Sequence, residues 1–138
     1  MKQRIYSFAI LLTILLGFSL SSCSGGSPAD DIVTELNKEM PMFIDEGLTG
    51  TQAFAEGPNV VMEITVDEDV YDFSELKLYK SELKDMMRAG MLEDGDNEDF
   101  EVLADNNVGI IYRFTGDQSG RSFDVSYSPN ELRRMSRY

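Results

Sequence analysis

Two stretches of the chain carry apolar residues at helical spacing. The first contains Ile32, Val33, Leu36 and Met40, which predict a helix ending near Pro41. Before it, Ser27-Pro28-Ala29-Asp30 has the serine, proline and carboxylate typical of a helix N-terminus. The second stretch predicts one long helix over residues 73–92, with an apolar face formed by Phe73, Leu76, Tyr79, Leu83, Met86 or Met87, and Met91.

Four other stretches have strand character. Residues 49–56 and 59–67 are separated by Gly57-Pro58, and residues 108–114 and 122–127 are joined by a segment rich in turn formers, so each pair predicts a β-hairpin. A single helical turn is expected at residues 100–104, and Ser128-Pro129-Asn130-Glu131 predicts a short terminal helix. The order α-ββ-α-ββ-α predicts an α+β domain, a four-stranded antiparallel sheet with the long helix packed on one face.

The N-terminus has the layout of an export signal. Lys2 and Arg4 precede an apolar run over residues 5–20, which is followed by small residues and the single cysteine, Cys23. Leu20-Ser21-Ser22-Cys23 resembles the lipobox of bacterial lipoproteins. By that resemblance, residues 1–22 are a signal peptide, and Cys23 becomes the acylated first residue of the mature chain. Several acyl chains on one cysteine make a stable membrane anchor.

The remaining chain divides into a tether and a domain. Residues 23–28 are rich in Gly and Ser and predict a flexible tether, and residues 29–138 predict a single α+β domain. Ser24 follows the cysteine at the position where aspartate marks inner-membrane retention, so the expected location is the outer membrane. The sequence leaves open whether the domain faces the periplasm or the cell surface.

Composition excludes several classes of function. The chain of 138 residues has no histidine, which removes His-dependent catalysis and histidine metal sites, and its one cysteine permits no intrachain disulfide. A formal net charge of −13, which becomes −15 when the two basic residues of segment 1–22 are removed, argues against nucleic-acid binding. We therefore expect a protein that is not an enzyme, needs no cofactor and binds no nucleic acid.

Several motifs resemble one bacterial family. They are residues 36–41, 60–68 and 107–114, then Gly116-Asp117, Ser119-Gly120-Arg121 and Ser128-Pro129-Asn130-Glu131-Leu132. Together they are similar to small secreted proteins and lipoproteins common in Bacteroidetes. The resemblance covers most of residues 30–135 and implies no activity and no functional residues, because the family has no assigned function.

Charge is distributed unevenly along the mature chain. Residues 23–112 hold 5 basic and 22 acidic residues, whereas residues 113–138 hold 5 basic and 3 acidic ones. This basic C-terminal region could receive an acidic segment of a partner, and its candidate binding residues are Arg113, Arg121, Tyr127, Arg133 and Arg134. The alternative is that these arginines pair with carboxylates of the same domain.

An acidic segment offers weak candidates for a metal site. Asp94, Asp96 and Glu98 could give oxygens to Ca²⁺, but the glycine and glutamate of an EF-hand loop are missing, so a solvated loop is expected. The sequence as a whole predicts an envelope lipoprotein that acts as a non-enzymatic interaction or accessory module, with an unidentified envelope protein as its partner. The alternatives are a lipoprotein that binds a small ligand or a divalent cation, and a small inhibitor of an envelope hydrolase.

Overall fold

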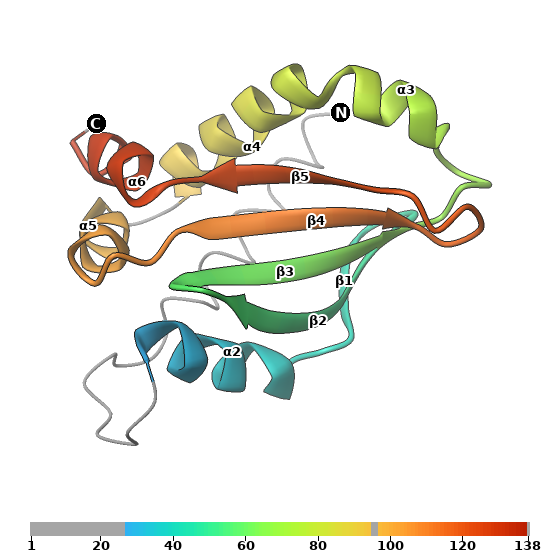
Figure 1. The fold of residues 1–138 in the computed structure, drawn as a ribbon. Coiled ribbons are helices and arrows are strands. Elements are labelled where there is room, and N and C mark those ends of the chain that lie inside the picture. The colour runs from blue at the N-terminus through green and yellow to red at the C-terminus, as the bar shows by residue number, and fades with distance from the viewer. Residues whose placement is uncertain (1–26, 95–96, 138) are drawn as a thin grey trace.

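The computed structural model describes residues 27–94 and 97–137, without the side chains of residues 94–99. In chain order the elements are α2 (Pro28–Lys38), β1 (Met42–Asp45), β2 (Leu48–Glu56), β3 (Asn59–Val66), α3 (Phe73–Leu78), α4 (Lys80–Asp94), α5 (Asn97–Asp105), β4 (Ile110–Gly116), β5 (Ser122–Tyr127) and α6 (Pro129–Met135). The fold class is α+β, as the sequence predicts (Figure 1).

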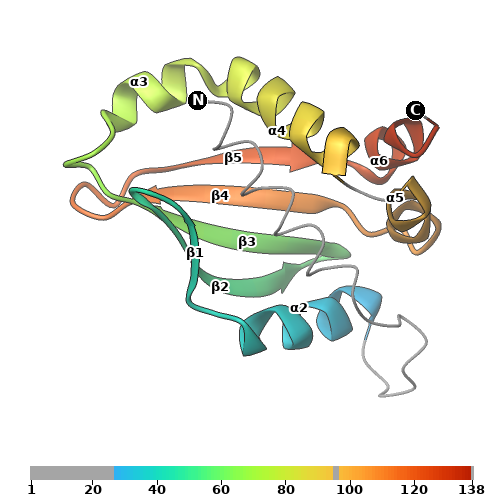
Figure 2. The ribbon, with the colours of Figure 1, turned by 180° about the vertical axis from the view of Figure 1, so that it is seen from behind.

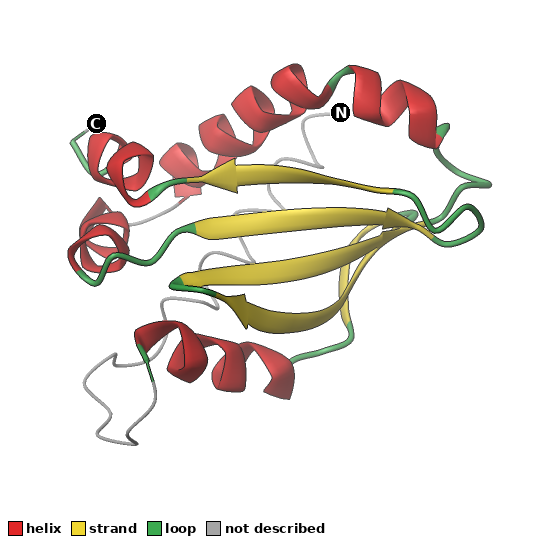
Figure 3. Ribbon diagram, in the orientation of Figure 1, coloured by secondary structure: helices red, strands yellow, loops and turns green. Residues whose placement is uncertain are grey.

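A five-stranded sheet with the order β1-β2-β3-β4-β5 forms the centre of the domain. Both predicted hairpins are present, because β2 pairs antiparallel with β3 and β4 pairs antiparallel with β5. The prediction of a four-stranded, wholly antiparallel sheet is wrong in two respects. The short strand β1 adds a fifth strand along β2, and β3 and β4 run parallel (Figure 3).

The parallel pair follows from the length of the connection between β3 and β4. Helices α3 and α4 carry the chain back along the sheet, and α5 delivers it to Ile110, which pairs with Val60 near the start of β3. A parallel pair requires a crossover of about a dozen residues or more, which this return provides, whereas a short turn can join only antiparallel strands. The hairpins are local patterns in the sequence, but the direction of β4 depends on this return path.

Helices α2 and α4 pack on one face of the sheet, α5 and α6 lie at the end of β4 and β5, and the hydrophobic core lies between these helices and the sheet (Figures 1 and 2). Alternate residues of the strands point into it, including Met62, Ile64, Tyr112, Phe114 and Val125. Helix α2 contacts β2 and β3, while α4 contacts β5, so the two helices lie over opposite margins of the sheet (Figure 2). The opposite face of the sheet carries no described helix.

The expected long helix over residues 73–92 is divided at Tyr79. Tyr79 ends α3 with φ −96° and ψ 27°, and α4 starts at Lys80. Phe73, Met87 and Met91 are buried as predicted, whereas Tyr79 at the junction is 52% exposed. The single turn expected at residues 100–104 is the nine-residue helix α5, which buries Phe100 and Leu103.

Local capping rules are obeyed at both ends of the domain. Ser27 and Asp30 form a reciprocal capping box at the start of α2, and Ser128 and Glu131 form another at the start of α6. Helix α2 is also joined to the sheet by Asn37, whose amide group donates to the carbonyl oxygen of Ala53 and accepts from its N–H, both at 2.9 Å. This side chain satisfies the backbone of β2 where β1 no longer runs beside it.

Candidate partner-binding surface

The face of the sheet opposite the helices, which we call the open face, carries one of the predicted binding residues, Arg113. Strand register sets its side chains in three rows across β2, β3, β4 and β5, composed of Thr49-Thr65-Thr115-Ser122, Gln52-Glu63-Arg113-Asp124 and Phe54-Val61-Ile111-Ser126. Phe43 of β1 pairs with Thr49 at the margin of this face and is 77% exposed. Along the strands, the face therefore carries a hydroxyl row, a polar and charged row, and a mainly apolar row in which Val61 is fully buried.

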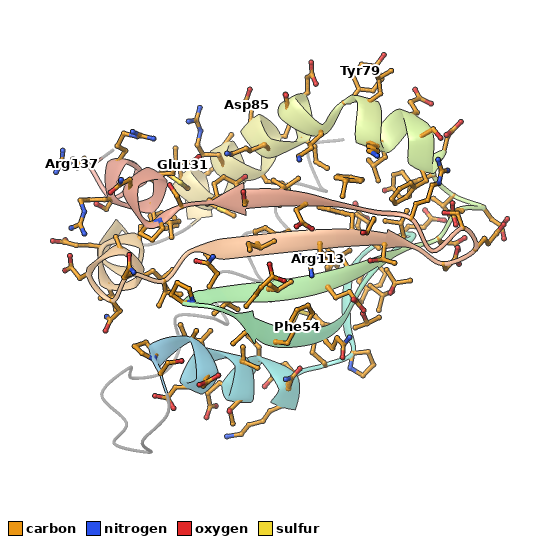
Figure 4. The ribbon with its side chains drawn as sticks, in the orientation of Figure 1. Phe54, Tyr79, Asp85, Arg113, Glu131 and Arg137 are labelled. Carbon is orange, nitrogen blue, oxygen red and sulfur yellow. The ribbon has the colours of Figure 1, made fainter. Side chains whose placement is uncertain are left out.

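Arg113 lies at the centre of the open face (Figure 4). Its Nε and Nη2 donate to the two carboxylate oxygens of Asp124 at 2.8 and 3.0 Å, and Nη2 also donates to Glu56 at 3.2 Å. The guanidinium stands 5.7 Å from the ring centroid of Phe54. The hydrogen bonds to Asp124 raise the pKa of Arg113 above its ordinary value. This arginine is thus fixed by its own domain and holds β2, β4 and β5 together across the face.

Arg121 lies at the far end of the same strands, outside the Arg113 cluster. Its guanidinium is 5.3 Å from the ring of Phe73 and donates to Ser74 Oγ at 3.1 Å. Close by, one carboxylate oxygen of Glu68 accepts from the N–H groups of Gln118 and Ser119, each at 2.6 Å. These backbone hydrogen bonds, that from Ser119 most strongly, lower the pKa of Glu68 below its usual value. The contacts fix the β4–β5 turn against the β3–α3 loop.

Tyr127 belongs to the core rather than to the surface. The residue is 1% exposed, and its hydroxyl donates to the carbonyl oxygen of Lys84 at 2.7 Å. Burial raises the pKa of this hydroxyl. Above the ring, at 5.3 Å from its centroid, stands the ammonium group of Lys84, which pairs with Glu131 at 2.8 Å. Tyr127, Lys84 and Glu131 therefore connect α4, β5 and α6.

Glu131 has a lowered pKa within this three-residue cluster. Partial burial acts in the opposite direction, but the hydrogen bonds from Lys84 and from the Ser128 backbone outweigh it. Glu131 consequently combines two roles, because it completes the capping box of α6 and pairs with α4.

Helix α6 carries the last two predicted residues. Arg133 donates to Asp105 of α5 at 2.8 Å, while Arg134 is exposed. The five predicted residues do not form one site. Arg113 lies on the open face, Arg121 at the far turn, Tyr127 in the core, and Arg133 and Arg134 on α6.

The acidic segment between α4 and α5 gives no metal centre in the described part of the chain. Asp96 lies outside the described residues, as do the side chains of Asp94 and Glu98. Among the described residues, no group of three or more His, Cys, Asp or Glu side chains is arranged to hold a metal ion. Within residues 27–94 and 97–137, no helix is long and apolar enough to cross a membrane.

Sequence reasoning missed an exposed apolar position at the end of α3. Leu78 is 76% exposed, next to the 52% exposed Tyr79, and Figure 4 shows Tyr79 on the helical margin of the molecule. Periodicity alone placed Tyr79 on the buried face, because it assumed one continuous helix. The available signal was compositional, since Leu78 and Tyr79 stand between Lys77 and Lys80.

Comparison with known proteins gives similarities in fold. No protein-family model matches the chain, and no curated protein matches it in sequence. A protein of Pseudomonas aeruginosa that is described as secreted has a similar structure. The TM-score is 0.63 at 11% identity, over 76% of this chain and 89% of that one. EpsS, the pilotin of the Vibrio vulnificus type 2 secretion system, is similar with a TM-score of 0.52 and 12% identity, over 75% of this chain and 87% of that one. At these identities the comparison establishes a shared fold.

Proposed function

We propose that this protein is a bacterial envelope lipoprotein that acts as a non-enzymatic module for binding another envelope protein. The observation that carries the proposal is the fold shared with EpsS, a pilotin of a secretion system, over 87% of that chain. The fold shared with the Pseudomonas aeruginosa protein described as secreted supports the same envelope location. The resemblance of the strand and turn motifs to small lipoproteins of Bacteroidetes extends this proposal to a source of that type.

Cys23 is the proposed point of attachment to the membrane. The cysteine follows a basic start, an apolar run and a lipobox-like Leu20-Ser21-Ser22. Acylation at this position anchors the domain, and Ser24 directs it to the outer membrane. The Gly/Ser-rich tether that precedes the Ser27 cap of α2 then sets the distance between the bilayer and the domain.

Binding rather than catalysis agrees with the chemistry of the described residues. The chain has no histidine, and no charged residue among those described is fully buried. General acid or base catalysis by a carboxylate usually relies on burial to adjust its pKa. The carboxylates of Glu56, Glu68, Asp124 and Glu131 instead serve as hydrogen-bond acceptors within the fold.

Fractionation of cells that express the full chain tests the anchor. We expect the wild-type protein in the membrane fraction, with an acylated Cys23 at its N-terminus by mass spectrometry, and Cys23→Ala outside that fraction. Ser22→Ala, which leaves the cysteine in place, is the matched control and should remain in the membrane fraction. Retention of Cys23→Ala in the membrane would reject the lipoprotein assignment.

Crosslinking in intact cells tests the partner. A short amine-reactive crosslinker applied to cells with the wild-type protein should give a discrete complex with one envelope protein, identified by mass spectrometry. The same complex should be reduced when Cys23→Ala removes the protein from its membrane. Recovery of the protein solely as an uncrosslinked species would contradict the interaction role.

A further inference from the structure

The β1 edge of the sheet is protected against pairing with another chain. Strand β1 has four residues, follows Pro41, and shifts its register between Phe43 and Asp45. Farther along β2, the side chain of Asn37 occupies both backbone groups of Ala53. Short length, proline, irregular pairing and a covering side chain are devices that block a sheet edge. This side of the sheet is therefore closed to an added strand.

The opposite edge, formed by β5, lacks these devices. Its six residues, Ser122–Tyr127, pair with β4 in unbroken register and include neither proline nor glycine. The one charged side chain of the strand, Asp124, is directed toward β4, because Arg113 holds both of its carboxylate oxygens. A regular edge strand of this kind is a template for pairing with another extended chain.

The register of β4 and β5 shows which backbone groups face outward. At the turn, the N–H of Gly116 donates to the carbonyl oxygen of Arg121 at 2.9 Å, so these residues form a hydrogen-bonded pair of the ladder. Hydrogen-bonded and non-hydrogen-bonded pairs alternate along an antiparallel ladder. Every second residue of β5 consequently turns its N–H and C=O groups away from β4. These outward residues are Ser122, Asp124 and Ser126.

The rest of the described chain does not use these outward groups. No hydrogen bond between residues of the two described ranges, 27–94 and 97–137, involves their N–H or C=O groups. Helix α4 runs along this margin (Figure 2), but the hydrogen bond that it accepts from β5 comes from a side chain, the hydroxyl of Tyr127. Ser122 and Ser126 are exposed. The outward backbone groups are thus available to a partner.

The surroundings of the edge specify the pattern of an added strand. The side chains of Phe123 and Val125 point into the core beneath α4, where Leu83 is only partly buried. On the other face lie the outward residues, which are small or polar. Because side chains alternate between the faces of a strand, an added strand needs apolar residues toward α4 and polar residues on the open face.

Backbone geometry and charge decide what kind of partner fits. Outward N–H and C=O groups at alternate residues match an extended chain, whereas a helix uses its backbone groups internally. A second copy of this chain would bring together two mature domains of net charge −15 each, which repel one another. An extended segment of a different protein avoids that repulsion.

We propose that the β5 edge binds an extended segment of the envelope partner, which adds a strand to the sheet. This inference rests on the proposed interaction function and specifies its surface and its mode of recognition. Backbone groups of the segment bond to those of Ser122, Asp124 and Ser126 and supply the affinity. The alternation of its side chains, apolar toward α4 and polar on the open face, supplies the specificity.

A binding assay with a strand peptide tests this mode of recognition. The lipidated full chain in non-ionic detergent is titrated with a fluorescent peptide of alternating Val and Thr with a terminal Lys, and with the same peptide N-methylated at every residue. We expect the unmodified peptide alone to bind, and Ser126→Pro to weaken its binding at least tenfold. Proline removes an outward N–H and leaves the hydrogen bonds to β4 in place. Ser126→Ala keeps that N–H and is the matched control, with unchanged affinity.

Three results of this assay would overturn the inference. The first is no binding of the unmodified peptide to the wild type, and the second is binding of the N-methylated peptide with equal affinity. The third is wild-type affinity in Ser126→Pro, provided that thermal unfolding shows this variant to be folded. If Ser126→Pro does not fold, the comparison of the two peptides on the wild type decides.

Photo-crosslinking in cells separates this inference from the proposed function. A photoreactive residue is placed at Ser126 on the β5 edge, and in a second strain at Phe43, which is 77% exposed on the β1 edge. We expect Ser126 to crosslink to one segment of an envelope protein, identified by peptide mass spectrometry, and Phe43 to give no such product.

The contrary outcomes of this experiment have different meanings. Absence of a crosslink from Ser126, while the amine-reactive reagent still gives a complex, would overturn the β5 edge as the site and leave the interaction function intact. A crosslink from Ser126 to a second copy of this chain would overturn the class of partner. Absence of any complex with either reagent would reject the proposed function, and this inference with it.

Discussion

At the residue scale, the side chain of Asn37 makes the backbone hydrogen bonds that a neighbouring strand makes elsewhere in the sheet. Its side-chain amide meets both backbone groups of Ala53 at 2.9 Å, as a neighbouring strand would. Strand β1 pairs with β2 only as far as Gly50, so this part of β2 would otherwise present an unpaired edge. The side chain therefore both fixes α2 and blocks pairing with other chains.

Asn37→Ala should lower the free energy of unfolding by about 1–3 kcal/mol, because it leaves a partly buried donor and acceptor without partners. Urea denaturation of the purified protein measures this loss. Asn130→Ala, at an exposed position of α6, should change stability far less. Equal stability of Asn37→Ala and the wild type would contradict the role of the amide.

Glu68 is the residue whose charge should couple stability to pH. Its pKa in the folded protein is lowered by the hydrogen bonds from Ser119 and Gln118, so its stabilising effect is complete above its ordinary pKa of 4.5. The effect is lost as the pH falls through the lowered folded-state value. Glu68→Gln should accordingly reduce Tm at pH 7, and the difference from the wild type should shrink in acid.

Thermal unfolding at neutral and acidic pH, with Glu82→Gln as the control for loss of one exposed carboxylate, tests this expectation. A difference between Glu68→Gln and the wild type that grows in acid would show that the sign is wrong.

The residues that sequence reasoning could place are those with local partners. The capping boxes at Ser27 and Ser128 involve groups three positions apart, so the serine and the carboxylate are visible together in the sequence. The partners of Arg113 and Tyr127 are 11 to 57 positions away. The excess of basic residues near the C-terminus could be counted in the sequence. Which arginine contacts which carboxylate depends on the register of the sheet, which the sequence did not reveal.

At the scale of elements, Tyr127 connects α4, β5 and α6, and its contribution to stability can be tested. The phenol hydroxyl donates to Lys84, while the ring supports the Lys84 ammonium that pairs with Glu131. Tyr127→Phe keeps the ring and removes the hydroxyl, so it should cost about 0.5–1.5 kcal/mol of unfolding free energy.

Tyr79→Phe is the matched control, because it removes the same hydroxyl from an exposed side chain at the junction of α3 and α4. Denaturant titration should show a loss for Tyr127→Phe and almost none for Tyr79→Phe. The reverse order would refute the structural role of the Tyr127 hydroxyl.

Elements with strong local patterns were predictable, and their mutual arrangement was not. Both hairpins contain alternating strands joined by a short turn-rich segment, so their pairing is encoded nearby. β1 was missed because its four residues, Met42–Asp45, are too few to show alternation. The break at Tyr79 was missed because neither proline nor glycine interrupts residues 73–89.

At the scale of the whole molecule, carboxylates are concentrated at one end of the sheet. One end brings together the β1–β2 turn, the β3–α3 loop and the β4–β5 turn, connected by Asp67 N–H to the Gly47 carbonyl and Asp117 N–H to the Val66 carbonyl. These loops carry the carboxylates Glu46, Asp67, Glu68, Asp69, Asp72 and Asp117. Helices α3 and α4, which hold four basic and five acidic residues, run along the β5 margin (Figure 1). Repulsion among these carboxylates is stronger in the folded state than in the expanded unfolded chain, so it lowers the free energy of unfolding.

Screening that repulsion with salt should stabilise the protein, and a parallel titration with calcium should distinguish it from a calcium-binding protein. Raising NaCl from about 0.01 M to about 0.15 M shortens the Debye length from about 30 Å to about 8 Å, so Tm should rise by a few degrees. A fall in Tm would mean that attractive ion pairs such as Arg113–Asp124 dominate the electrostatics of the fold. Sub-millimolar CaCl₂ added at constant ionic strength should leave Tm unchanged, because a ligand that binds only the native state would raise it. A rise of several degrees with calcium alone would favour a cation-binding lipoprotein over the proposed interaction module.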